Sequence, residues 1–185
     1  MADESRNALA EHLDLAGRME PLLGPAARVA AAIVAAYERG GRVYTFGNGG
    51  SSADAAHFAE ELVGRYKRER RPLAAQSLSI DASALTCIAN DYSYDEVFER
   101  QVRGFVRDAD VVIGFSTSGR SPNVVRGLAA ARELGAATVL FAGAAGGEAE
   151  HVLAVPSEST ARIQEMHVLL LHMILEEVDA WAAAH

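Results

Sequence analysis

The sequence predicts an α/β fold built on a largely parallel sheet of five strands, in a single domain over residues 1–185. Five short runs rich in aliphatic and β-branched residues alternate with longer helical patterns, and short turns join them. One of these runs, Val111–Phe115, is apolar throughout, which is typical of a strand buried on both faces of a parallel sheet. The length and the 50% hydrophobic content fit one domain with a sizeable core.

Two helical patterns precede the first strand, so residues 1–40 form an N-terminal pair of helices ahead of an α/β core over 41–185. The first pattern covers 3–18. The second covers 26–39 and ends at Gly40-Gly41, a plausible C-terminal stop. A sheet of this size does not need both helices. Either they pack against a partner subunit or they cover the sheet of their own domain.

The core then alternates strand and helix. Asp81 is a good N-cap for the helix that follows it, and Cys87, in the apolar run of that helix, is expected to be a small buried residue. The predicted strands cover 42–46, 74–80, 111–115, 137–141 and 151–155, and the predicted helices cover 52–65, 82–89, 94–106, 122–134 and 161–184.

Charge and cysteine content narrow the function classes. The formal net charge of −8 argues against broad nucleic-acid binding by the whole surface. One cysteine excludes an internal disulfide framework and fits the cytoplasm, as does the lack of a signal-peptide pattern or a long apolar run. The basic run 65–71 could bind phosphate, water, a neighbouring acidic subunit or nucleic acid. Nucleic acid ranks last because no aromatic platforms are interleaved.

Two turns carry the polar chemistry, and each lies between a strand and a helix. The first, Gly47–Ser52, is rich in glycine, so the backbone can approach a ligand closely. The second, Ser116–Ser121, carries four hydroxyls at a helix start, where N–H groups and the helix dipole favour a phosphate dianion. An ordinary tight turn and simple N-capping are the respective alternatives.

Two helices offer metal-ligand chemistry. His57 and Glu61 are four residues apart and share a helix face. On the last helix, Gln164 and His172 lie roughly on one side, with His167 between them. Either these groups gather around a metal or they form a hydrogen-bonded structural cluster.

The chain resembles the phosphoheptose isomerase (sedoheptulose 7-phosphate isomerase) family of the sugar isomerase (SIS) domain group over essentially its whole length. The resemblance lies in Gly47-Asn48-Gly49-Gly50-Ser51, His57–Leu62, Asn90-Asp91, Ser116–Gly119 and Arg162–Glu165. It implies a five-stranded parallel sheet sandwiched by helices and a homotetramer with active sites between subunits. It also implies isomerisation of D-sedoheptulose 7-phosphate in heptose biosynthesis, without nucleic acid or membrane.

The same resemblance implies the site residues. One Zn²⁺ per subunit is expected on His57, Glu61, Gln164 and His172, and Glu61 and His172 form the acid–base pair. Substrate contacts are expected from Asn48, Gly49, Gly50, Ser51, Glu61, Arg65, Asn90, Asp91, Ser116, Thr117, Ser118, Ser121 and Gln164.

One departure and two alternatives accompany the resemblance. Family members often carry Asp where this chain has Ala161. A related regulator that binds the replication initiator shares the motif over 161–167 but lacks the acid–base pair that matches Glu61 and His172. A non-catalytic binding or sensing protein, or an isomerase of another phosphosugar, is therefore the alternative.

Overall fold

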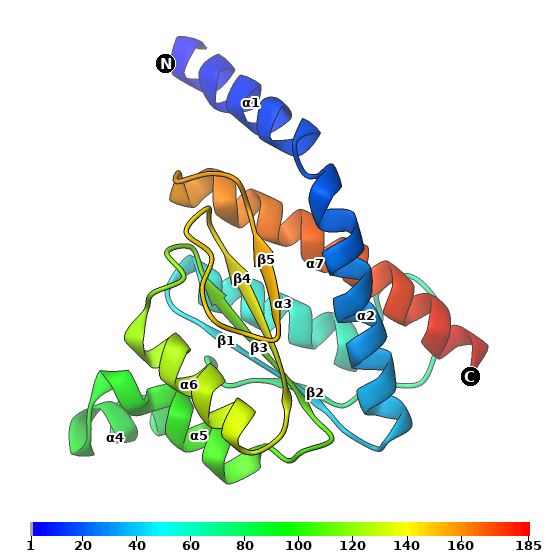
Figure 1. Cartoon of the computed structure of the whole chain (residues 1–185), viewed down its shortest axis with the longest axis vertical. Coiled ribbons are helices and arrows are strands. Elements are labelled where there is room, and N and C mark those ends of the chain that lie inside the picture. The colour runs from blue at the N-terminus through cyan, green and yellow to red at the C-terminus, as the bar shows by residue number, and fades with distance from the viewer. Residues whose placement is uncertain (1) are drawn as a thin grey trace.

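The computed structural model describes residues 2–185 and has the predicted α/β architecture (Figure 1). Its single sheet is all-parallel, with the strand order β2-β1-β3-β4-β5. Gly47 at the end of β1 pairs with Phe115 near the end of β3, so the two polar turns that follow these strands leave the same edge of the sheet. The strands are β1 (Val43–Gly47), β2 (Ala75–Ser77), β3 (Val111–Ser116), β4 (Ala137–Ala142) and β5 (His151–Ala154).

Every predicted strand and helix is present, with shifted ends. The main difference is β2, which has three residues where seven are predicted; it is an edge strand and pairs only with β1. The helix predicted over 94–106 begins as a separate 3₁₀ turn, Tyr94–Glu96. The α-helices are α1 (Ala2–Gly17), α2 (Leu23–Glu38), α3 (Gly50–Val63), α4 (Ala82–Asp91), α5 (Val97–Phe105), α6 (Pro122–Glu133) and α7 (Thr160–Ala184).

Alternating side chains on the strands build a core on each face of the sheet. Val111, Ile113 and Phe115 of β3 pack with α2, α3 and α7. Val112 of the same strand, with Phe46 of β1, packs with α5 and α6 on the opposite face. The result is the expected three layers, and it places α3 and α7 together on one side, where they contact each other.

Of the two predicted roles, the structure confirms one, for α2; packing of these helices against a partner subunit stays a prediction. α2 covers the sheet of its own chain, because Val29 and Ile33 are fully buried in the same core as β3. α1 projects away from the sheet (Figure 1) and leaves Leu9 and Leu13 59% and 62% exposed. No single helix in residues 2–185 is long and apolar enough to cross a membrane. Residues 3–17 and 20–38 would be long and apolar enough only if taken together, and the chain bends by 49° between them.

The helix α4 lies at the rim of the molecule, and none of its residues is fully buried. The Asp81 side chain caps it as predicted, since its Oδ1 accepts from the Ala84 N–H at 3.0 Å. The prediction that Cys87 is buried is wrong: the thiol is free and exposed. The apolar run 82–89 packs through only one side, with Leu85 and Ile88 partly buried.

Candidate active site

The helices α3 and α7 bring three predicted residues together. His57, Glu61 and His172 each place a ligand atom so that all three lie within 4.8 Å of one another. His57 Nε2 is 3.4 Å from Glu61 Oε1, and the two imidazole rings meet edge to face at 5.1 Å between centroids. Two imidazoles and a carboxylate at this spacing form the donor set that Zn²⁺ prefers in catalytic sites.

Burial lowers the proton affinity of His172 in this cluster. The pKa of His172 is lowered, first by burial and then by the neighbouring His57, while Glu61 acts in the opposite direction. Next to the cluster, Tyr66 lies against the His172 ring at 5.7 Å between centroids.

Gln164, the fourth predicted ligand, lies against the start of α3. A Cβ atom added at Gly50 would come within 2.5 Å of Gln164 Nε2, so a larger residue here would displace this amide from its position. Gly49 precedes it with φ of 56°, a left-handed conformation that also favours glycine. Gly50 therefore allows close contact between α3 and α7, and Gly49 allows the left-handed backbone ahead of α3. Ser51 is buried in the first turn of α3, and its N–H donates to Asn48 O.

His167 is separated from this cluster. It is fully buried on the sheet side of α7, between Phe115 and Phe141, and its Nε2 lies 3.2 Å from Ala142 O. Burial lowers its pKa to about 4, which keeps it neutral. Its contacts are with the sheet, whereas Gln164 lies against Gly50 at the start of α3, so His167 is a core histidine.

The second turn folds its hydroxyls toward one another. Ser116 Oγ lies 3.0 Å from Ser121 Oγ and 3.4 Å from Ser118 Oγ. Gly119 has φ of 65°, and an added Cβ there would sit 1.7 Å from Gly146 O, so the loop after β4 supports this turn. Hydroxyls gathered ahead of the first turn of α6 suit a phosphate group.

A cavity of about 510 Å³ borders this turn. Thr117 and Ser118 line it on one side and Ser157 on the other. The guanidinium of Arg120 also lines it, and within residues 2–185 this side chain makes no ion pair. An unpaired cation beside these three hydroxyl residues adds to the attraction for an anion, although Glu158 lines the same cavity.

Three other predicted substrate residues contact neither the His57–Glu61–His172 cluster nor the hydroxyl turn. Arg65 is exposed just beyond α3 and has no ion-pair partner within the described chain. Asn90 and Asp91 are exposed at the end of α4 and bond to each other, with Asn90 Nδ2 2.8 Å from Asp91 Oδ1. The structure of one chain therefore does not bring these residues to the His57–Glu61–His172 cluster.

The basic run is largely satisfied within the chain. Arg68 and Arg70 both bind Asp179 of α7, and Lys67 pairs with Glu176 of the same helix. The sequence does not predict these ion pairs within the chain, because the acidic partners lie more than 100 residues away.

Sequence reasoning also missed Asp54. This carboxylate is 8% exposed and lies one turn before His57 on α3, and its Oδ2 has no hydrogen-bond partner in the described chain. Burial raises its pKa to about 6, with His57 acting in the opposite direction. Its spacing of three residues from His57 was the available signal.

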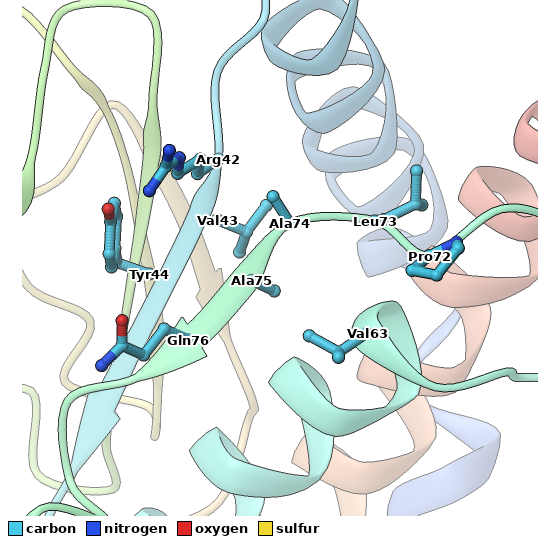
Figure 2. Close-up of a pocket in the computed structure, with 9 residues that line it drawn as sticks. All are labelled: Arg42, Val43, Tyr44, Val63, Pro72, Leu73, Ala74, Ala75 and Gln76. Carbon is cyan, nitrogen blue, oxygen red and sulfur yellow. The ribbon is translucent and has the colours of Figure 1, made fainter.

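A further cavity, of about 300 Å³, lies at the edge of the sheet (Figure 2). It is formed where the chain enters β1 and β2, with Val63 of α3 beside Ala75 of β2. Arg42 is its only charged lining residue. It lacks the clustered polar groups of the two turns, which lie beyond the opposite ends of the strands.

Comparison with known proteins shows the family of this chain. Residues 15–143 match the SIS domain family model. The chain is 48% identical over 180 residues to a phosphoheptose isomerase of Paramagnetospirillum magneticum, covering 95% of this chain and 94% of the relative. It is 50% identical over 155 residues to that of Aquifex aeolicus, covering 82% and 81%.

The solved structures point the same way. Phosphoheptose isomerase GmhA from Neisseria gonorrhoeae superposes with a TM-score of 0.89 at 38% identity, covering 97% of this chain and 98% of that one. The chain therefore belongs to the SIS-domain family and, within it, to the phosphoheptose isomerases.

Proposed function

We propose that this enzyme converts D-sedoheptulose 7-phosphate to D-glycero-D-manno-heptose 7-phosphate by acid–base aldose–ketose isomerisation. The observation that carries the proposal is the convergence of Glu61 and His172 with His57 within 4.8 Å, from two helices that flank the glycine turn. A carboxylate beside an imidazole offers a base for a carbon-bound proton and an acid for oxygen. The regulator that matches the 161–167 motif lacks this pair, so the enzyme is the better account.

The two turns divide the substrate between them. We assign the phosphate to Ser116, Thr117, Ser118 and Ser121, in the turn ahead of α6. The Ser116 hydroxyl contacts those of Ser118 and Ser121. The sugar then extends toward Asn48, Gly49 and Gly50, which border α3. This orientation brings its reacting carbons to the end of the site that holds Glu61 and His172.

The proton transfers follow from this placement. Glu61 removes a proton from C1 of the ketose, the electron pair forms the C1–C2 double bond, and the C2 oxygen takes a proton from His172. Glu61 then returns the proton to C2 while His172 takes the proton from O1, which leaves the aldehyde at C1 and restores both side chains. The roles of Glu61 and His172 are open to exchange.

His57, Glu61, Gln164 and His172 would hold the metal, since two imidazoles, a carboxylate and an amide oxygen suit Zn²⁺. When bound, the ion polarises the carbonyl and hydroxyl oxygens of the substrate. We propose one ion per subunit.

A homotetramer with sites between subunits also belongs to the proposal. Exposed Leu9 and Leu13 on α1 are one candidate contact. Another is an apolar cavity of about 380 Å³ between α3 and β2, bordered by His57 and by the exposed Ile80. A partner subunit bound at this cavity would reach the site.

We also propose that the protein works in the cytoplasm, because the free exposed thiol of Cys87 suits a reducing compartment.

The test is turnover of a panel of ketose phosphates by protein stripped with a chelator and then supplied with zinc. We expect sedoheptulose 7-phosphate to be preferred and activity to return with the metal. Glu61→Gln and His172→Gln should abolish turnover, while the exposed neighbour change Glu60→Gln should not. Preference for a hexose or pentose phosphate would change the substrate, and near-wild-type activity of either site variant would sink the acid–base assignment.

A further inference from the structure

The Asn48 side chain is held by the protein on three of its four hydrogen-bonding positions. We propose that Asn123 and Tyr94 are positioning residues that fix the Asn48 amide in one orientation and leave one N–H free to donate to the substrate. The inference rests on the proposed function, in which Asn48 faces the sugar phosphate.

The orientation begins at the backbone of α6. Asn123, the second residue of that helix, is 2% exposed, and its Oδ1 lies 2.9 Å from the Val124 N–H. A backbone N–H can only donate, so the atom that faces it must be the amide oxygen. The Asn123 NH₂ group is thereby assigned to the other side of its amide.

Asn123 passes this orientation to Asn48. Asn48 Nδ2 donates to Asn123 Oδ1 at 2.8 Å, and Asn123 Nδ2 donates back to Asn48 Oδ1 at 2.9 Å. Turning only the Asn48 amide over would set NH₂ against NH₂ and oxygen against oxygen. Turning both would break the bond from Val124.

Tyr94 completes the arrangement. Its hydroxyl donates to Asn48 Oδ1 at 2.9 Å, which fills the second lone pair of that oxygen. One N–H of Asn48 is then the only hydrogen-bonding capacity left on the side chain. Asn48 presents a donor and no acceptor, so it selects a substrate oxygen that accepts, such as a hydroxyl, carbonyl or phosphate oxygen.

The position of this network suggests why both partners matter. Asn48 belongs to the turn before α3, which carries His57 and Glu61, and Asn123 lies two residues after Ser121 of the hydroxyl turn. The paired amides tie the proposed sugar end of the site to the proposed phosphate end. Tyr94 adds the segment that follows Asn90 and Asp91.

Two nearly isosteric substitutions test the proposal by steady-state kinetics with sedoheptulose 7-phosphate. Asn123→Asp keeps acceptors for Val124 and Asn48 but replaces the donor to Asn48 Oδ1 with a carboxylate oxygen. Loss of that bond leaves the Asn48 amide free to turn. This should lower kcat/KM by about ten- to a hundredfold, mainly through KM. Tyr94→Phe should lower it by about three- to tenfold, since one donor to Asn48 remains.

Matched controls are available in the same chain. Asn7→Asp changes an exposed asparagine of α1, and Tyr92→Phe removes a hydroxyl that makes no hydrogen bond in the described chain while leaving the ring under Arg100. Both should keep the wild-type KM. If Asn123→Asp fails to fold, the exposed Tyr94→Phe carries the test alone. Wild-type kcat/KM in the folded variants would overturn the inference.

Its failure can be told apart from failure of the proposed function. If the wild type turns over no ketose phosphate, the proposed function fails, and the affinity for sedoheptulose 7-phosphate is then measured by calorimetry. Weaker binding by Asn123→Asp and Tyr94→Phe than by the two controls supports the positioning role. Equal binding by all variants, or no binding by the wild type, overturns it.

Discussion

The buried guanidinium of Arg70 donates through Nε to Asp179 Oδ1 at 3.1 Å, and both side chains are 1% exposed. The same guanidinium reaches back to α3, where Nη2 donates to Glu61 O at 2.6 Å and Nη1 to Leu62 O at 2.9 Å. These carbonyls belong to the last turn of α3 and lack helical partners of their own. Arg70 therefore joins the two helices that carry His57 and His172.

Asp179→Asn should destabilise the protein strongly. It leaves the buried charge of Arg70 without its counter-charge, and breaking a buried pair in this way costs about 3–5 kcal/mol. The measurement is the free energy of unfolding in urea. Glu176→Gln is the matched control on the same helix, because its pair with Lys67 is exposed and should contribute little. Equal stability of the two variants would contradict the role of the Arg70–Asp179 pair in joining α3 to α7.

Gly119→Ala should damage the hydroxyl turn beyond the cost of its backbone conformation. The added methyl would overlap Gly146 O, which forces the turn and the loop after β4 apart. Gly146→Ala is the control, since it has nearly the same φ of 64° but no atom within 4 Å of the added Cβ. Both should lose about 1–2 kcal/mol from the left-handed conformation. Only Gly119→Ala should also raise KM for the phosphosugar more than about tenfold; an equal KM in the two variants would refute this role of the turn.

The sequence was sufficient for the elements and for the pairing of His57 with Glu61 on α3. Hydrophobic periodicity locates the strands and helices, and a spacing of four residues puts His57 and Glu61 on one face. That His172 faces them depends on the packing of α3 against α7, which spacing along the chain cannot give. The family resemblance supplied that pairing.

The residues whose roles the sequence did not predict share a physical cause. Asn123, Asp179 and Cys87 have roles set by neighbours far along the chain or by a helix that packs on one side only. Local patterns carry no information on which partner will bury a polar group. The pattern 65–71 therefore predicts only external partners for its basic residues, whereas the Arg70 side chain is 1% exposed and pairs with Asp179.

Gly50→Ala should weaken metal binding without unfolding α3. Alanine favours a helix more than glycine does, but its Cβ would push the Gln164 amide away from its place beside α3. We expect zinc affinity, measured by calorimetry, to fall about ten- to a hundredfold. Gly17→Ala at the end of α1, where an added Cβ meets nothing within 4 Å, should leave it unchanged. Unchanged affinity in Gly50→Ala would remove Gln164 from the ligand set.

His167 should make the protein less stable in acid. Burial lowers its pKa from 6.5 to about 4, so between these values the unfolded chain binds a proton that the folded protein excludes. The stabilisation is complete above pH 6.5 and is lost as the pH falls toward 4. One pKa unit corresponds to about 1.4 kcal/mol, so the loss is on the order of 3 kcal/mol. His167→Gln can still donate to Ala142 O but does not titrate, so its free energy of unfolding should fall less over this range than that of the wild type. His185→Gln, which changes an exposed histidine in the same way, is the matched control. If the His167→Gln slope matched the wild type, the acid sensitivity would have to come from other groups.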